Sequence, residues 1–389
     1  MMYYRHYLLV VIVLLFCPSL VWGNEFRLVP SISVKGEYND NIFFAANDIK
    51  RDFVTTISPG LEMVNNTDRL DTYLMARLAR FDYADNRELS ATDQLYNGKF
   101  RYHATPLLNI STEAGYVRDS QPGRDIQTSG IILSTVSRNR YNASLSADYQ
   151  FSEKTAAVAS FAFVRDNYES TKYYDDLSHD FNAGLVHDLG QYFQGVKGKV
   201  NLGYSDYVFS DSRIDSVMGT VGFSRDFSET GSIMIDCGIR HTRSEFSAGL
   251  IQLNNDDWGW VGNVSLNYKG ELGNGSLTYN RDITPASGLS GAVERNALTL
   301  LTQYRMTSEF SILLSAGYYT NKSDAGQFST QVIDQRTIRV NPGVRYEFSK
   351  NIYLESSYDY TAIDDLASNT TVNRNLFSIR LYIQHPIFE

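Results

Sequence analysis

The chain of 389 residues has only two cysteines, Cys17 and Cys237. Cys17 lies beside an N-terminal apolar run, so Cys237 is the single cysteine of the remaining chain and cannot form an internal disulfide there. Cys237 alternates in sequence with Ile233, Ile235 and Ile239. This pattern predicts a small hydrophobic side chain on an apolar face rather than a nucleophile.

Long hydrophobic runs are also scarce. The mean hydropathy is −0.29, and only the run from Leu8 to Phe16 is strongly apolar over its length. These features exclude a protein built from membrane-spanning helices. They do not exclude membrane-spanning strands, because such strands hide their hydrophobicity in alternation.

The one apolar run follows Arg5 and His6 and precedes the modest or small residues Val21 and Gly23. It is too short to cross a bilayer as a helix. We predict residues 1–23 to be a secretory signal peptide and residues 24–389 to form the mature protein.

An excess of basic charge is missing. The formal charge is −9, and the 35 lysines and arginines are scattered rather than clustered, so we expect no nucleic-acid partner. No linker rich in proline, glycine or serine divides the chain, although its length would allow two or three soluble domains. We therefore expect one domain.

Catalytic and cofactor motifs are absent as well. The sequence has no Gly-x-Ser-x-Gly elbow, no phosphate-binding Gly-x-x-x-x-Gly-Lys loop and no Cys-x-x-Cys pair, and its mature histidines lack metal-ligand spacing. We predict no enzyme activity, no cofactor and no metal. Two alternatives stay open: a hydrolase built from Ser, His and an acid on one rim, and calcium at Asn39 to Asn41 or Asn254 to Asp257.

Strict alternation is what the sequence does have, and the stretch Trp258 to Asp282 shows it best. Trp258, Trp260, Val264, Leu266 and Tyr268 share one parity, while polar residues fill the other. A turn at Leu272 to Gly275 reverses the chain, and Leu277, Tyr279 and Ile283 resume the apolar face. Period two predicts an antiparallel hairpin whose apolar face ends in aromatic side chains.

The same unit repeats along the mature chain, with short turns alternating with longer polar loops such as Phe246 to Asp257 and Asn321 to Gln331. This asymmetry is typical of outer-membrane barrels, as are the 27 tyrosines and 21 phenylalanines. We predict an all-β, transmembrane, antiparallel up-and-down β-barrel of about 18 strands in the outer membrane of a Gram-negative bacterium, with both termini periplasmic. One strand could begin as early as Ile131 and project beyond the membrane.

The first strand and loop, Ser31 to Phe43, carry the sequence Tyr38-Asn39-Asp40-Asn41-Ile42-Phe43. This segment resembles the Tyr-x-Asp-Asn-Ile-Phe turn of the outer-membrane β-barrel porins found with bacterial exopolysaccharide systems. The resemblance implies a passive conduit for a polymer or smaller sugars, and it implies no catalytic residues. The implied partners are outer-membrane lipid, polysaccharide or small sugars in the lumen, and periplasmic export components.

The polar parity should face the lumen, and it carries both signs of charge in comparable number. Such a wall suits a water-filled pore and would be prohibitively costly in a dry core. The inward basic pairs Lys99/Arg101 and Lys197/Lys199 are the best candidates for contact with an acidic polysaccharide. The predicted pore-lining residues are Lys99, Arg101, Lys197, Lys199, Asp236, Arg240, Lys269, Arg339, Arg345 and Glu347.

These observations favour a pore for polysaccharide export. A general or sugar-nutrient porin is the first alternative, but it would normally fold a long outer loop into the lumen, whereas the loops here look short. The second alternative is a structural or adhesion barrel without transport, which would favour a narrow, salt-bridged interior.

Overall fold

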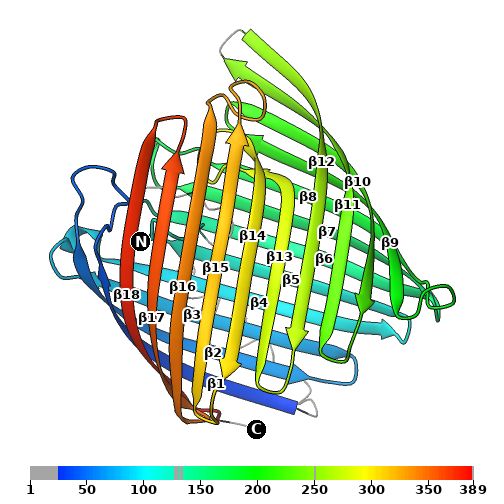
Figure 1. The fold of residues 1–389 in the computed structure, drawn as a ribbon, viewed down its shortest axis with the longest axis horizontal. Coiled ribbons are helices and arrows are strands. Elements are labelled where there is room, and N and C mark those ends of the chain that lie inside the picture. The colour runs from blue at the N-terminus through cyan, green and yellow to red at the C-terminus, as the bar shows by residue number, and fades with distance from the viewer. Residues whose placement is uncertain (1–24, 127–130, 132–134, 249–250, 388–389) are drawn as a thin grey trace, which may run out of the picture.

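The computed structural model describes residues 25–126, 131, 135–248 and 251–387. Its eighteen strands form one antiparallel sheet in which each strand pairs with its sequence neighbours, and β1 also pairs with β18 (Figure 1). The closed barrel and its strand number confirm the sequence prediction. No helix of the described part is long and apolar enough to cross a membrane.

The strands of the first half are Glu25–Asn39 (β1), Asp52–Asn66 (β2), Leu70–Tyr83 (β3), Ala91–Thr105 (β4), Leu108–Asp119 (β5), Arg138–Ser152 (β6), Thr155–Tyr168 (β7), Asp176–Asp188 (β8) and Val196–Phe209 (β9). Those of the second half are Ser212–Asp226 (β10), Gly231–Ala248 (β11), Ile251–Lys269 (β12), Gly273–Pro285 (β13), Ala292–Arg305 (β14), Phe310–Ser323 (β15), Ile333–Ser349 (β16), Ile352–Asp365 (β17) and Thr370–Gln384 (β18). A single turn of 3-10 helix, Arg87–Leu89, follows β3.

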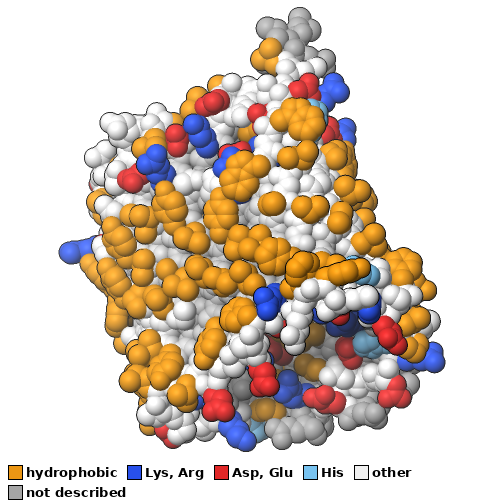
Figure 2. Space-filling model, turned by 45° about the vertical axis from the view of Figure 1, so that its right-hand side comes forward, with side chains coloured by type: hydrophobic (Ala, Val, Ile, Leu, Met, Phe, Trp, Pro, Cys, Tyr) orange, Lys and Arg blue, Asp and Glu red, His pale blue; other side chains and the backbone are white. Residues whose placement is uncertain are grey.

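Side-chain parity separates the two faces of the wall. Leu266, Tyr268 and Trp260 of β12 are exposed large hydrophobic residues, and equivalent residues recur at every second position of the other strands. Figure 2 shows hydrophobic side chains gathered in a broad band over the wall, with charged side chains above and below it. The band is the lipid-facing belt, and Cys237 lies exposed on the same face, as predicted.

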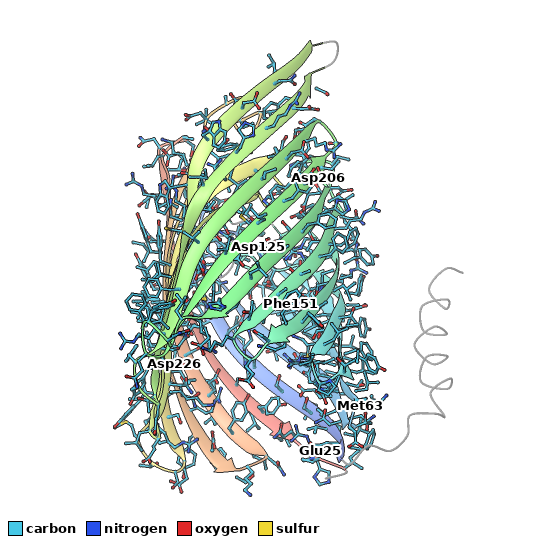
Figure 3. The ribbon with its side chains drawn as sticks, turned by 90° about the vertical axis from the view of Figure 1, so that its right-hand side faces the viewer. Glu25, Met63, Asp125, Phe151, Asp206 and Asp226 are labelled. Carbon is cyan, nitrogen blue, oxygen red and sulfur yellow. The ribbon has the colours of Figure 1, made fainter. Side chains whose placement is uncertain are left out.

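The first and last described residues, Glu25 and Ile387, lie at one end of the barrel. Glu25 pairs with Asn66 beside the first tight turn, and the amide of Ile387 donates to the carbonyl of Leu28 at 2.9 Å. Figure 3 places Glu25 at this end, which we call the turn end because its connections are short. The opposite end carries the longer connections and is called the loop end.

The hairpin of β11 and β12 rises above the rest of the loop end (Figure 1). The prediction of a loop from Phe246 to Asp257 was therefore wrong, because these residues mostly continue the two strands, paired as far as Ala248 and Ile251. The turn after β12 also lies earlier than predicted, since Gly273 already begins β13. Polar side chains gave both stretches the composition of a loop, whereas strand pairing needs only the backbone.

The seam between β12 and β13 is shorter than its neighbours. Its ladder has eight pairs and ends at Gly262 and Arg281, whereas β11 and β12 share eighteen pairs. Beyond the seam β13 bends, and Ile283 packs with inward-facing side chains such as Tyr207 and Ile214. The prediction that Ile283 continues the outer apolar face was wrong for this reason.

The two ends of the barrel make a topological prediction. A short epitope tag inserted at Lys172, in the exposed connection between β7 and β8 at the loop end, should bind antibody on intact cells. The same tag at Glu229, in the turn between β10 and β11, should bind only after the outer membrane is permeabilised. Labelling of intact cells at Glu229 but not at Lys172 would invert the barrel.

Candidate functional site

The ten predicted pore-lining residues all lie on the inward-facing parity, opposite the exposed hydrophobic residues of their strands. Their exposure differs greatly along the barrel. Lys99 on β4 is 56% exposed, whereas Arg240 on β11 is 2% exposed. Arg240 and Arg339 are packed into the loop end, and the other eight stand on the half of the wall nearer the turn end. Their participation in conduction stays a prediction.

This contrast holds around the wall. At the turn end, inward side chains such as Asp71 remain largely exposed. At the loop end, inward side chains such as Thr242, Asn321 and Thr361 have no exposed surface. The lumen is therefore open to solvent from the turn end and filled at the loop end.

Four groups of loop-end side chains fill the lumen, and together we call them the outer plug. They come from residues 40–51, from the described residues 120–126, 131 and 135–137, from residues 286–291 and 324–332, and from the strand ends that these segments contact. Buried members are Ile42, Phe44, Ile126, Ile131, Ala286 and Phe328. The expectation of short outer loops that stay outside the lumen was wrong, because apolar residues within polar segments pack across the barrel.

Two described residues of the segment 120–137 contact strands on the far side of the lumen. The segment leaves β5 and returns to β6, yet Ile126 packs with Ile363 of β17, and Ile131 packs with Val293 of β14 and Ile333 of β16. Asp125 lies within the outline of the barrel in Figure 3. The prediction that a strand starts near Ile131 and projects outward was therefore wrong, since β6 begins at Arg138.

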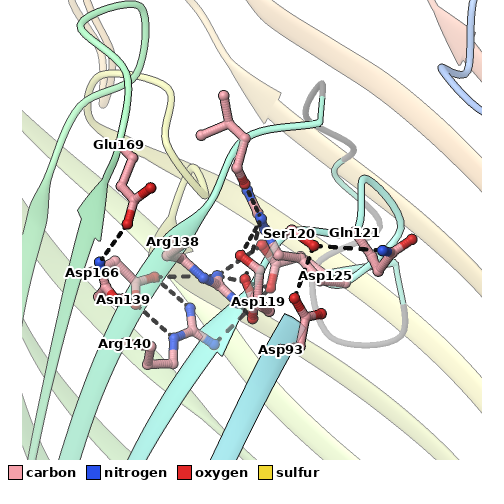
Figure 4. A network of polar contacts seen from close by, with 12 residues as sticks. Asp93, Asp119, Ser120, Gln121, Asp125, Arg138, Asn139, Arg140, Asp166 and Glu169 are labelled. Carbon is pink, nitrogen blue, oxygen red and sulfur yellow. Dashed lines mark hydrogen bonds and ion pairs between the residues drawn. The ribbon is translucent and has the colours of Figure 1, made fainter. Parts of the chain in front are cut away.

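A buried ion cluster holds the base of this segment to the wall (Figure 4). The Arg138 side chain is 3% exposed and donates to Asp119 at 2.7 Å, to Asp125 at 3.0 Å and to Asp166 at 3.3 Å. Arg124 and Arg140 complete the cluster by pairing with Asp119 at 3.1 Å and with Asp166 at 2.5 Å. Each of these guanidinium groups thus has a carboxylate partner, which offsets the cost of burying the charges.

A second anchor lies across the lumen. Asp359 of β17 accepts hydrogen bonds from Arg339 at 2.6 Å and from Arg374 at 2.8 Å. The Arg374 guanidinium also lies 4.3 Å from the ring centroid of Phe44, which packs with Ile126. The segments 40–51 and 120–137 therefore meet above one charged support.

A third anchor closes the short seam. Arg240 donates to Asp257 of β12 at 3.0 Å and to Glu294 of β14 at 2.9 Å. Its guanidinium lies 5.1 Å from the ring centroid of Phe328, and Arg281 also pairs with Glu294. Arg240 thus joins the two sides of the seam beneath residues 324–332, and this explains its burial.

The predicted basic pairs differ in how far they are neutralised. Lys99 lies 3.3 Å from Glu113, so its charge is partly compensated. In the described part of the chain, Arg101, Lys197 and Lys199 have no carboxylate within 4.0 Å, and Lys199 points its ammonium at the Met234 sulfur at 2.8 Å. These three cations contribute positive potential to the open half of the lumen.

Sequence reasoning missed the charged anchors Arg124, Arg138 and Arg374 and the aspartates Asp119, Asp125 and Asp166. Arg138 and Arg140 stand two residues apart at a strand end, as the predicted basic pairs do. Their acidic partners lie on separate strands or on a loop, so only the folded chain shows that they converge.

The side chains of the two predicted calcium sites make other contacts or point to different faces. The Asn41 amide donates to the carbonyls of Ala45 and Asn373, and Asp40 accepts from the backbone and side chain of Asn375. Asn254 to Asp257 lie along a strand, so their side chains alternate between its faces. Among the described residues, no three His, Cys, Asp or Glu side chains are placed to hold a metal ion.

The model of a family described as "Putative beta-barrel porin 2" matches residues 23–182. The predicted resemblance to β-barrel porins is confirmed. The chain has the fold of an outer-membrane β-barrel, and this match makes it porin-like over residues 23–182. The family named by this match is a porin family rather than an enzyme family. No curated protein matches the chain.

Solved structures similar to this porin-like barrel include OccK3 (OpdO) of Pseudomonas aeruginosa, with 12% identity, a TM-score of 0.48 and coverage of 96% of this chain and 100% of that chain. OccAB4 of Acinetobacter baumannii has 10% identity, a TM-score of 0.46 and coverage of 93% and 98%. The copper transporter OprC has 9% identity, a TM-score of 0.49 and coverage of 89% and 63%.

Proposed function

We propose that this barrel is a conduit through which a bacterial polysaccharide leaves the periplasm. The observation that carries the proposal is the asymmetry of the lumen, with an exposed polar wall at the turn end and the outer plug at the loop end. With the turn end and both termini in the periplasm, a polymer arriving from inside would enter freely, whereas a solute arriving from outside would meet packed apolar side chains and buried ion pairs.

The inner wall also has chemistry suited to sugars. A cavity of about 360 Å³ is lined by the carboxamides of Asn182, Asn201, Asn263 and Asn280 together with Asp236. Asn263 donates to Asn280 and Asn201 donates to Thr220, but each amide group has a second N–H that can donate to a sugar hydroxyl, so the asparagines suit a sugar without demanding one charge. The neutral amides support a carbohydrate, and the uncompensated cations Arg101, Lys197 and Lys199 favour an acidic one.

The paired substitution Lys197→Glu with Lys199→Glu tests this proposal. We expect the barrel to fold and insert, because both side chains face the open lumen, and we expect reversal potentials in a salt gradient to shift toward cations. Polysaccharide secreted by the parent organism should fall. Planar-bilayer recordings and quantification of secreted sugar check the two results, with the wild-type gene restored to a deletion strain as control.

A normal polysaccharide output beside a shifted potential would retain the channel and remove this substrate. An unchanged potential would show that the two lysines do not influence permeation.

A sugar-nutrient porin is the second candidate, and the inward segment 120–137 favours it because porins for uptake constrict the lumen with such a loop. The two functions differ in direction. Growth of the deletion strain on limiting neutral and acidic oligosaccharides should equal that of the wild type if the barrel exports. Slow growth that the restored gene corrects, with normal polysaccharide output, would favour uptake. Steady current steps in bilayers separate either pore from a structural barrel, which would be silent.

A further inference from the structure

Two tyrosines form a stack on the inner wall near the turn end. Tyr353 of β17 and Tyr382 of β18 are register partners, and their ring centroids lie 4.8 Å apart with an angle of 20° between the ring planes. Both stand on the inward parity, opposite the exposed Leu354 and Leu381. Two other stacked pairs among the described residues, Tyr96 with Tyr116 and Phe161 with His179, stand on the outward parity, so the inward pair at the entrance has a different environment.

Cations surround this stack. The Arg345 guanidinium lies 4.6 Å from the ring centroid of Tyr353 and donates to Glu355 at 2.7 Å and 3.1 Å. Arg380 approaches the same carboxylate only to 3.9 Å and keeps 41% of its side chain exposed. The Glu355 carboxylate is thus shared by two guanidinium groups. Arg380 therefore keeps N–H donors that can bind the carboxylate of a ligand in a bidentate manner.

One face of the stack has no bulky cover. The register places Ser33 of β1 beside Tyr382 and Ser58 of β2 beside Ser33. Serine side chains are too small to cover a phenol ring, and Tyr382 stays partly exposed, with its hydroxyl donating to Gln384 at 3.4 Å. Aromatic faces flanked by a few polar groups are typical of sites that hold a flat ligand by stacking and fix it by hydrogen bonds.

Beyond these serines, the inner wall again carries aromatic, amide and charged side chains. A cavity of about 550 Å³ is lined by Tyr73, Asn97, Lys99 and Glu113 on β3 to β5. Aromatic, amide and basic side chains therefore follow one another around the turn end from β16 to β5, over a length that suits a chain of rings better than a single small solute.

We propose that Tyr382, Tyr353, Arg345 and Arg380 form the entry site for an acidic polysaccharide, with the non-polar face of one sugar ring on Tyr382 and the carboxylate of an acidic sugar on Arg380. The proposal rests on the proposed export function and names its substrate class, a polymer that contains uronic acids.

Binding to the purified full-length barrel in detergent tests the site without requiring conduction. The probes are hexagalacturonate, which is acidic, and maltohexaose, which is neutral, and the measurement is isothermal titration calorimetry. We expect hexagalacturonate to bind more tightly than maltohexaose. Tyr382→Ala should weaken hexagalacturonate binding about threefold to tenfold, as expected for the loss of one stacking contact. Tyr382→Phe should retain it, and Arg380→Gln should abolish the preference for the acidic probe.

The matched control is Tyr358→Ala, because Tyr358 lies on the same strand as Tyr353 but faces outward. Circular dichroism must show a folded barrel for each variant. Equal binding of both probes, or unchanged hexagalacturonate binding in Tyr382→Ala, would overturn the site. Hexagalacturonate binding lost in Tyr382→Ala, together with normal polysaccharide secretion by that variant, would support the site and count against export.

Discussion

Replacing Arg138 by alanine should convert the small, steady current steps of the wild-type barrel into large, fluctuating ones. The substitution leaves Asp119, Asp125 and Asp166 buried without their shared cation. Breaking a buried ion pair in this way costs about 3–5 kcal/mol. A free-energy change of about 4 kcal/mol alters a two-state equilibrium by about three powers of ten. Segment 120–137 carries Asp125, so its release relieves the repulsion, and we expect it to leave the lumen while the strands stay paired.

Single-channel recording in planar bilayers checks this result. Arg118→Ala is the matched control. Arg118 of β5 lies at the loop end of the barrel, as Arg138 does, but its side chain is 35% exposed and pairs with the exposed Glu169. An exposed pair contributes about 0–1 kcal/mol, so conductance should not change. Equal conductance of the wild type and Arg138→Ala, with both folded, would show that the outer plug does not limit the current.

The strands and their faces could be predicted from the sequence because the period of two is a local property. Each hairpin closes over a few residues. The parity of a residue such as Leu266 or Cys237 within its strand predicts which side of the wall its side chain faces. The barrel is then the only closed solution for a chain of such hairpins in lipid, where no edge can remain unpaired.

The outer plug could not be predicted in the same way. Ile126 and Ile131 lie in a segment whose composition is that of a polar loop, and their partners Ile363, Val293 and Ile333 lie far along the chain. Ile126 stands alone among polar residues and Ile131 begins a run of only three apolar residues, so neither carries a period that indicates a crossing of the lumen.

The candidate site also has one part that local sequence predicts and one part that it does not. Parity placed Arg240 and Arg339 on the inner face, but burial depends on what covers that face, and the covering loops come from elsewhere in the sequence. The stacked pair Tyr353 and Tyr382 had a visible signal, since both stand on the polar parity of otherwise regular strands. An aromatic residue on the inward face of a barrel strand is a departure that sequence analysis can search for.

The substitution Leu266→Arg should destabilise the barrel strongly, because Leu266 is 40% exposed on the outer face of β12, within the lipid belt. Arginine on the lipid face of an outer-membrane barrel costs about 2–4 kcal/mol near the bilayer midplane and less toward the interfaces, and Leu266 lies three residues from the turn end of β12, so we expect a cost at the lower end of this range. Urea titration of refolded protein in lipid vesicles measures the free energy of unfolding directly.

The next residue supplies the control. Asn267 lies on the inward parity, where its amide donates to the Ser265 hydroxyl at 3.2 Å, and an arginine there keeps its head group in water. Asn267→Arg should therefore change the free energy of unfolding far less than Leu266→Arg. Because the two positions share a strand, a depth and a set of neighbouring strands, their difference isolates the choice between lipid and water. Equal destabilisation by both substitutions would mean that the lumen at this depth is dry or that the faces of β12 are reversed, and either result would remove the basis for a polar conduit.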